Sequence, residues 1–249
     1  MRYGLVSDIH SNLAALDAVL EHMGSVDGLL CMGDIVGYGP QPNEVINRLR
    51  EFNTFSIVGN HDLAVLGALE LRDFNGDAIE ANLWTRSQLN KDNWEWLEKL
   101  EPLARFDDNV TLAHGSPSEP IWEYLTTPHA ASRSFPEFDT PLCFVGHTHL
   151  PRVFRMLEGK RVGTNLPKVE MRIPDPTETI IVGFGRLILN PGSVGQPRDG
   201  DPRAAYALYD DSEQIISYRR VSYDIAKTQN IMRDYDLPER LAMRLDFGL

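Results

Sequence analysis

Few cysteines and no long hydrophobic run occur in this sequence, and each absence excludes a class of protein. The two cysteines among 249 residues, Cys31 and Cys143, both lie inside apolar, strand-like segments. We expect two buried thiols in a reducing compartment, with a structural disulfide as the alternative. No run approaches the ~18 apolar residues that a transmembrane helix needs, so the sequence predicts no membrane span and no membrane partner.

A secretory signal and an excess of positive charge are also missing. The segment Met1 to Ser7 enters a strand pattern directly, without a signal-peptide core or a small-residue cleavage site, so we expect a cytoplasmic protein. The 24 Lys and Arg against 36 Asp and Glu leave a net charge of −12. That charge repels nucleic-acid phosphates, so we expect no duplex-binding protein. A small anionic substrate stays compatible, because bound cations would dominate the field at a site.

What is present is the composition of an ordinary soluble protein, with 42% hydrophobic and 24% charged residues. A chain of this length can bury a sizeable core. No repeat, low-complexity segment or linker divides it. We therefore predict a single domain over residues 1–249 that ends in a helical tail over residues 224–249.

The first 150 residues alternate strand and helix patterns. Apolar runs bounded by glycine predict strands at 3–7, 28–32, 54–58, 110–113 and 142–145. Helical spacing follows Asn12, which is placed as a cap, and continues at 42–51 and over much of 63–100. Such alternation predicts a parallel sheet, with ligands at the carboxyl ends of its strands.

The pattern changes after His149. Five strand-like segments are joined by Gly, Pro and Asp turns without long helices, at 153–157, 179–183, 186–189, 204–209 and 214–221. We expect these to form an antiparallel second sheet. Two helices should follow, at 224–234 and 238–246. The segment 116–141 is rich in proline and aromatic residues, and we expect a long loop with one short helix that walls a site.

Two histidines separated by one residue come directly after the apolar run that ends at Val145. In Gly146-His147-Thr148-His149 the glycine permits a sharp turn that delivers both imidazoles into one pocket. Imidazole suits zinc, iron, manganese and nickel, so the pair is a candidate for metal binding. A hydrogen-bonded or surface pair is the alternative for this motif alone.

Polar residues of similar chemistry follow all five predicted strands of the first half. Each could serve locally as a cap, a turn residue or a satisfied core histidine. Together they form a ligand set for two divalent cations about 3.5–4 Å apart with one bridging carboxylate. The mixed nitrogen and oxygen donors suit Mn, Fe, Zn or Ni better than Ca or Mg. The candidate ligands are Asp8, His10, Asp34, Asn60, His114, His147 and His149.

These motifs, in this order, resemble the calcineurin-like metallophosphoesterase superfamily. They are Asp8-Ile9-His10, Gly33-Asp34, Gly59-Asn60-His61-Asp62, His114-Gly115 and Gly146-His147-Thr148-His149. Residues 7–12 and Asn190-Pro191-Gly192-Ser193 are similar to the branch of small bacterial and archaeal phosphodiesterases. The resemblance implies a four-layer α/β/β/α sandwich of two mixed sheets flanked by helices.

The resemblance also implies a division of roles. One metal would be held by Asp8, His10, Asp34 and His149, and the other by Asp34, Asn60, His114 and His147, with Asp34 as the bridge. A hydroxide shared by the metals would attack phosphorus in line. His61 would act near the leaving group as a proton donor or hydrogen-bond donor, and Asn60 and His61 would contact the substrate.

One departure concerns the second motif, which continues with Asp-Arg in the protein phosphatases and symmetrical dinucleoside tetraphosphatases. Gly37 and Tyr38 stand at those positions here, so the arginine clamp on phosphate is missing and the orienting partner of His61 is open. Arg198, in the turn 196–200, is a candidate replacement cation for substrate binding. Its alternative role is that of a solvated turn residue.

The leading hypothesis is a dinuclear metal-dependent phosphodiesterase that acts on a small phosphoester substrate. A phosphomonoesterase or nucleotidase on the same metal site is the alternative enzyme. A non-catalytic metal-binding scaffold is the third hypothesis, and it is disfavoured because the chain keeps every candidate ligand and His61.

Overall fold

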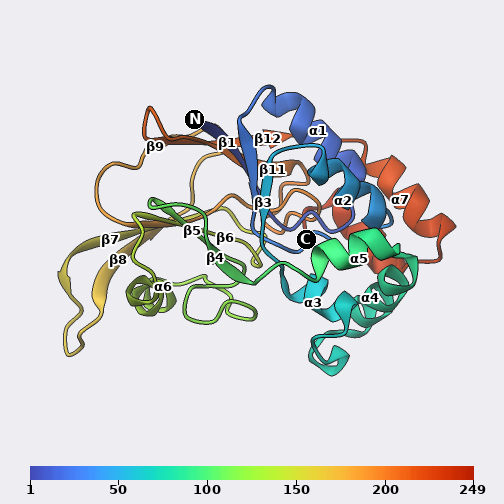
Figure 1. The fold of residues 1–249 in the computed structure, drawn as a ribbon, viewed down its shortest axis with the longest axis horizontal. Helices are drawn as coiled ribbons and strands as arrows, with labels where there is room; N and C mark the ends of the chain where they lie inside the picture. The colour runs from blue at the N-terminus through green and yellow to red at the C-terminus, as the bar shows by residue number, and fades with distance from the viewer.

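Two six-stranded mixed sheets form the centre of the computed structural model, which describes all residues 1–249 (Figure 1). The first sheet contains, in spatial order, β3 (Thr54–Ser56), β2 (Gly28–Cys31), β1 (Arg2–Val6), β11 (Ala204–Asp210), β12 (Ile215–Val221) and β9 (Thr179–Ile181). The second contains β4 (Leu103–Arg105), β5 (Val110–Ala113), β6 (Leu142–Val145), β10 (Leu187–Asn190), β7 (Arg152–Lys160) and β8 (Pro167–Arg172).

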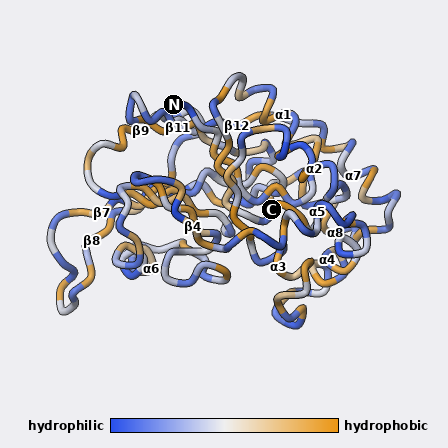
Figure 2. The backbone as a smooth tube through the Cα atoms, in the orientation of Figure 1, coloured by the Kyte–Doolittle hydropathy of each residue, from blue (hydrophilic) through white to orange (hydrophobic).

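The two sheets bury a common core between them. Leu5 and Leu30 of the first sheet belong to one apolar cluster with Leu112 and Phe144 of the second. Val6, the next residue along β1, points to the opposite face and joins the cluster beneath the helices. Strands buried on both faces need continuous apolar runs, which explains why the sequence shows little alternation there. Figure 2 shows these apolar stretches concentrated along the central strands.

Helices cover the outer faces of both sheets. Most lie over the first sheet, and α1 and α2 contribute Leu16 and Val45 to its outer core. They are α1 (Leu13–Met23), α2 (Pro42–Arg50), α3 (Asn60–Leu66), α4 (Gly76–Gln88), α5 (Lys91–Leu97), α7 (Ile225–Asp234) and α8 (Glu239–Met243). The second sheet is covered by α6 (Pro128–Ser134), on the opposite side of the molecule (Figure 1). The α/β/β/α order and the mixed sheets are as predicted.

The prediction of a separate antiparallel sheet after His149 is wrong. The later strands extend both existing sheets instead: β11 pairs antiparallel with β1, and β10 pairs parallel with β6. The physical reason is that β1 and β6 would otherwise present unpaired backbone groups at a buried edge. Local patterns show that a segment is a strand, but they do not show which edge it completes.

Short elements complete the chain, and none of them could cross a membrane. Single turns of 3₁₀ helix occur at Leu71–Asp73, Phe135–Glu137 and Arg244–Asp246. No helix has both the length and the apolar character of a membrane span. Both cysteines are free and buried.

Asn12 joins α1 to the C-terminal helices. Its side-chain oxygen accepts a hydrogen bond from the backbone N–H of Ala15 at 3.2 Å, as the predicted cap, and a second from the Thr228 hydroxyl of α7 at 2.9 Å. Its amide nitrogen donates to the carbonyl oxygen of Gly195 at 2.9 Å. Asn12 is 2% exposed. The C-terminal tail is therefore tied to the loop that follows β1 through a buried polar residue.

We predict that Asn12→Ala lowers the free energy of unfolding by about 2–4 kcal/mol, because it removes a cap and leaves buried partners unsatisfied. Urea denaturation measures the change. Asn90→Ala is the matched control, since Asn90 caps α5 through the N–H of Asn93 from an exposed position. That variant should cost only about 1 kcal/mol. Equal losses in the two variants would contradict the coupling role of Asn12.

Candidate metal centre

The carboxyl ends of β1, β2, β5 and β6 meet the start of α3 at one place. Asp8 and His10 follow β1, and Asp34 follows β2; His114 follows β5, and Asn60 begins α3. His147 and His149 follow β6. The structure thus brings together all seven candidate ligands, and each is at most 3% exposed. They are Asp8, His10, Asp34, Asn60, His114, His147 and His149.

The ligand atoms fall into two groups that share one carboxylate. In each group the nitrogen and oxygen atoms lie within 4.8 Å of one another. The first group is Asp8, His10, Asp34 and His149, and the second is Asp34, His114 and His147. The Nε2 of His114 lies 3.5 Å from Asp34 Oδ2 and 3.1 Å from the amide oxygen of Asn60, which brings Asn60 to the second group.

Hydrogen bonds to backbone carbonyls set the tautomer of three histidines. The Nδ1 atoms of His10, His114 and His149 lie 3.2, 2.8 and 2.5 Å from the carbonyl oxygens of Val36, Met32 and Gln196. A carbonyl oxygen only accepts, so each Nδ1 carries the proton and each Nε2 presents a lone pair to the cluster. This is the usual arrangement around metal-binding histidines.

Two nitrogen lone pairs face each other within the cluster. His10 Nε2 and His149 Nε2 lie 3.1 Å apart. Two acceptor atoms at that distance repel each other unless a cation or proton lies between them. Asp8 Oδ2 and His147 Nε2 are buried without any hydrogen-bond partner, which is rare for polar atoms in protein interiors. Imidazole nitrogens with carboxylate oxygens are the donors that divalent transition metals prefer, so these residues fit metal ions.

Backbone strain is concentrated at the same place. Asp8, His10, Asp34, His147 and His149 all have left-handed backbones, with φ values of 52°, 48°, 50°, 63° and 59°. This conformation costs about 1–2 kcal/mol for a residue with a side chain. It turns the chain sharply at each strand end, so that neighbouring side chains point into one cavity. Such strain typically occurs at functional sites.

Asp62 holds the two central loops together. Its carboxylate accepts hydrogen bonds from the backbone N–H groups of Ile35, Val36 and Gly59 at 3.2, 2.9 and 2.9 Å. These bonds connect the loop after Asp34 with the start of α3. A Cβ atom on Gly59 would lie 2.1 Å from Asp34 Oδ1, so only glycine fits beside that carboxylate. Asp62 belongs to the motif Gly59-Asn60-His61-Asp62, but the sequence alone indicated no role for it.

The turn that begins at Asn190 supports the site from the second sheet. The Asn190 amide donates to the carbonyl oxygen of Gly146 at 2.6 Å, and the Ser193 hydroxyl donates to that of Asp8 at 2.7 Å. The turn therefore fixes both strand ends that carry ligands. From the sequence, residues 190–193 were noted only as part of the family resemblance. Their supporting role could not be predicted, because Gly146 and Asp8 lie far from them along the chain.

His61 has a partner that sequence reasoning missed. Its Nδ1 lies 3.0 Å from the side-chain oxygen of Asn82 on α4, and both residues are buried. The amide oxygen accepts, so Nδ1 donates to it and Nε2 is left to face the site. The Tyr38 ring packs 4.2 Å from the His61 ring. Asn82 thus takes the place of the missing aspartate as the group that orients His61.

Aromatic side chains surround the cluster. Phe74 lies 5.1 Å from the ring of His61 and 5.1 Å from that of Trp122. Tyr124 stacks on His147 at 4.2 Å between ring centres, and it is 53% exposed. Trp122 and Tyr124 come from the segment 116–141, which walls the site as expected from the sequence.

Burial controls the protonation of the cluster. It raises the pKa of Asp8 to about 7 and that of Asp34 well above its usual range. It lowers the pKa of the ligand-group imidazoles of His10, His147 and His149 well below the usual value. Without cations, the imidazoles of these three residues are therefore neutral, and the carboxyls of Asp8 and Asp34 favour the protonated form.

Arg198 lies near the cluster without a carboxylate partner. Its guanidinium carbon is 5.9 Å from the centre of the Tyr38 ring. Its Nη2 and Nε donate to the side-chain oxygen of Gln196 at 2.8 and 3.3 Å. Burial raises the pKa of Asp8 and Asp34, and the positive charge of Arg198 offsets a small part of that rise.

Comparisons with known proteins agree with this site. Residues 1–214 match the model of the calcineurin-like phosphoesterase superfamily domain. The uncharacterized protein MJ0912 of Methanocaldococcus jannaschii is 40% identical over 98% of this chain and 97% of its own length. The crystal structure of a metallophosphoesterase from Sphaerobacter thermophilus is 45% identical, with a TM-score of 0.88 over 100% of both chains.

A more distant structure shows the same fold. The hypothetical protein PH1004 from Pyrococcus horikoshii OT3 is 20% identical, with a TM-score of 0.77 over 100% of this chain and 98% of its own. The relatives thus come from bacteria and archaea, as the sequence motifs suggest.

We predict that the affinity for added Mn²⁺ rises with pH between 5.5 and 7. The carboxyl of Asp8, with a pKa of about 7, is protonated below that pH and must release its proton when a cation binds. Each displaced proton gives about a tenfold rise in affinity per pH unit. The imidazoles of His10, His147 and His149, whose pKa values burial lowers, are already neutral and add no proton release. Titration calorimetry in two buffers of different ionisation enthalpy counts the protons. Binding at pH 6 without proton release would contradict this electrostatic account.

Proposed function

We propose that this chain, which belongs to the calcineurin-like phosphoesterase superfamily, is a dinuclear metal-dependent phosphodiesterase. Two ligand groups that share the buried carboxylate of Asp34 are the observation that supports two adjacent cations. A pair of divalent cations bridged by one carboxylate is a common arrangement for phosphoester hydrolysis. The two buried free cysteines suit a reducing compartment, and we place the enzyme in the cytoplasm.

We assign Asp8, His10, Asp34 and His149 to one cation, and Asp34, Asn60, His114 and His147 to the other. The donor set suits Mn, Fe, Zn or Ni. When bound, the cations supply the positive charge that activates water and neutralises the phosphoryl oxygens. Asp62 and the turn that begins at Asn190 hold the loops that carry these ligands.

His61 is the residue we assign to proton transfer. Asn82 holds its Nδ1, so exchange with the substrate takes place at Nε2. Burial lowers the pKa of His61 to about 3, so the ring is neutral without substrate. The negative charge of a bound phosphoester raises this pKa and favours the protonated ring, whose Nε2–H would donate to the leaving-group oxygen. Asn60, at the start of α3, adds its side-chain amide as a second contact to a phosphoryl oxygen.

The surroundings of the cations favour a diester over a monoester. Tyr38 occupies the position of the arginine clamp, and its ring packs against the rings of His10 and His61. A diester has one negative charge less than a dianionic monoester and carries a second organic group. Aromatic walls formed by Phe74, Trp122 and Tyr124 suit such a group. Arg198, which has no carboxylate partner, supports a phosphomonoesterase or nucleotidase as the alternative.

We predict that the protein hydrolyses bis-p-nitrophenyl phosphate with added Mn²⁺ or Ni²⁺, and faster than p-nitrophenyl phosphate. His61→Ala should lower kcat by about 10²–10⁴-fold, because it removes the proton donor. Elemental analysis should show unchanged metal content, since His61 is not a proposed ligand. Full activity of the variant would remove His61 from the mechanism. Metal binding without turnover of either ester would favour a scaffold.

We predict that Asn82→Leu lowers kcat at least about tenfold, because His61 loses the acceptor that fixes its ring. Asn82→Asp should restore most of the activity, since a carboxylate accepts the same Nδ1–H bond. Thr85→Val is the matched control: Thr85 lies one turn further along α4, is equally buried, and has a hydroxyl without a partner. Equal kcat values for the Leu and Asp variants would show that Asn82 has only a packing role.

A further inference from the structure

Tyr38 packs against two residues of the metal centre that have different roles. The centre of its ring lies 4.7 Å from that of His10, a candidate ligand, and 4.2 Å from that of His61. The ring centres of His10 and His61 are themselves 5.0 Å apart, so the three rings pack against one another. Tyr38 therefore contacts both a ligand group and the residue assigned to proton transfer.

The hydroxyl of Tyr38 has no hydrogen-bond partner within the protein. Tyr38 is 6% exposed, and a tyrosine buried to that extent usually has a partner for its hydroxyl. Each of the other buried tyrosines forms a hydrogen bond through its hydroxyl, namely Tyr3, Tyr206, Tyr209 and Tyr218. The partnerless hydroxyls of Ser11 and Thr85 are fully enclosed, whereas that of Tyr38 is not. A ligand can therefore reach it.

The surrounding structure holds the ring in one position. Tyr38 has a left-handed backbone with a φ of 56°, which is unfavourable for a residue with a side chain. Its ring packs in one apolar cluster with Ala81 of α4 and with Leu241 and Leu245 of the C-terminal helices. A strained backbone that is kept in place by packing is typical of residues that contact a ligand. The hydroxyl is thus positioned before any ligand binds.

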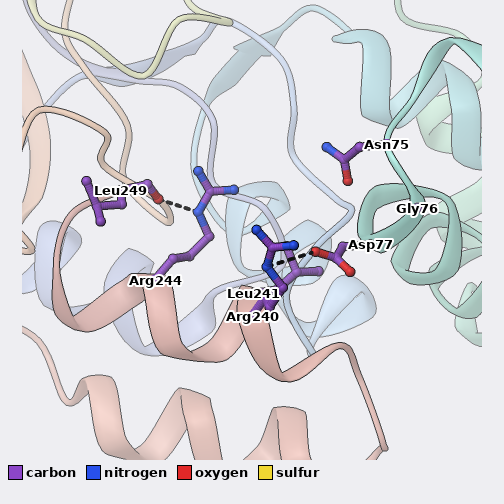
Figure 3. A pocket seen from close by; sticks show the side chains of 7 residues that line it. All are labelled: Asn75, Gly76, Asp77, Arg240, Leu241, Arg244 and Leu249. Carbon is purple, nitrogen blue, oxygen red and sulfur yellow. Dashed lines mark hydrogen bonds and ion pairs between the residues drawn. The ribbon is translucent and has the colours of Figure 1, made fainter.

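Leu241 supports this ring from a neighbouring pocket, which has a volume of about 680 Å³ and lies between α8 and the start of α4 (Figure 3). Leu241 lines that pocket and also a cavity of about 10 Å³ beside Tyr38. The charged groups of the larger pocket are engaged with one another, in the pairs Arg240–Asp77 and Arg244–Leu249. The hydroxyl of Tyr38, in contrast, has no such partner.

We propose that the Tyr38 hydroxyl donates a hydrogen bond to a phosphoryl oxygen of the substrate. This inference rests on the proposed function, because it takes the metal centre as the place where the phosphoester binds. A hydrogen bond to a charged oxygen is stronger than one between neutral groups. A guanidinium at this position would attract a dianionic monoester more strongly than a singly charged diester, whereas the uncharged phenol adds no such preference. Tyr38 is thus a substrate-binding residue that suits a diester.

The test removes only the hydroxyl, because Tyr38→Phe keeps the ring and its packing. In the protein loaded with Mn²⁺, titration calorimetry should show that the variant binds inorganic phosphate at least about tenfold more weakly than the wild type. The kcat/KM for bis-p-nitrophenyl phosphate should fall by a similar factor. Elemental analysis should show unchanged metal content, since Tyr38 is not a proposed ligand.

Urea denaturation distinguishes this contact from a structural role. Since the hydroxyl has no partner in the protein, Tyr38→Phe should leave the urea midpoint unchanged or raise it. Tyr206→Phe is the matched control: Tyr206 is 1% exposed, and its hydroxyl is hydrogen-bonded to His22 Nδ1 at 2.9 Å. That variant should lower the midpoint and keep the wild-type phosphate affinity and kcat/KM.

Two results would overturn the contact. One is an unchanged phosphate affinity and kcat/KM in Tyr38→Phe. The other is a loss of affinity together with a fall in the midpoint as large as that of Tyr206→Phe, which would show a structural role.

The outcomes also separate this inference from the proposed function. Weaker phosphate binding by Tyr38→Phe, in a protein that hydrolyses no diester, would overturn the phosphodiesterase and leave the contact standing. Hydrolysis of bis-p-nitrophenyl phosphate with the same kcat/KM and phosphate affinity in wild type and variant would have the opposite meaning. A wild type that neither binds inorganic phosphate nor hydrolyses either ester would overturn both.

Discussion

The burial of carboxylates and imidazoles in one cluster is the constraint on which the rest of the structure depends. Asp8 and Asp34 are 0% and 1% exposed, and removing two carboxyl groups from water is costly. The cost is met by protons on the carboxyls or by cations between the ligands. Facing lone pairs on His10 and His149 favour cations. The cluster is therefore arranged for metal ions before any bind, with each ligand direction already set by the backbone.

The fold maintains this arrangement against local strain. Left-handed residues at three strand ends would relax if the loops were free. The carboxylate of Asp62 and the turn at Asn190 tie those loops together with hydrogen bonds to backbone groups. Since the two sheets end at the same edge, each can brace loops that belong to the other.

The strand ends and the C-terminal helices contribute differently to the surroundings of the metal centre. The strand ends that carry the candidate ligands lie within residues 1–214, the range matched by the family model. The helices after residue 224 pack on α4 and Tyr38. Asn12, hydrogen-bonded to Thr228 of α7, ties that segment to the loop of Asp8 and His10.

Five of the six strands before His149, the capping role of Asn12 and the candidate ligands could be predicted from the sequence by itself, whereas the short edge strand β4 was missed. These features depend on neighbours along the chain: an apolar run, a glycine, and the polar residues that follow it. Only the tertiary structure decided that β10 and β11 complete the two sheets, that Asn82 orients His61, and that Asp62 joins the loop after Asp34 to the start of α3. Each of these is a contact between distant parts of the chain, and local patterns do not determine which surfaces meet when two elements pack.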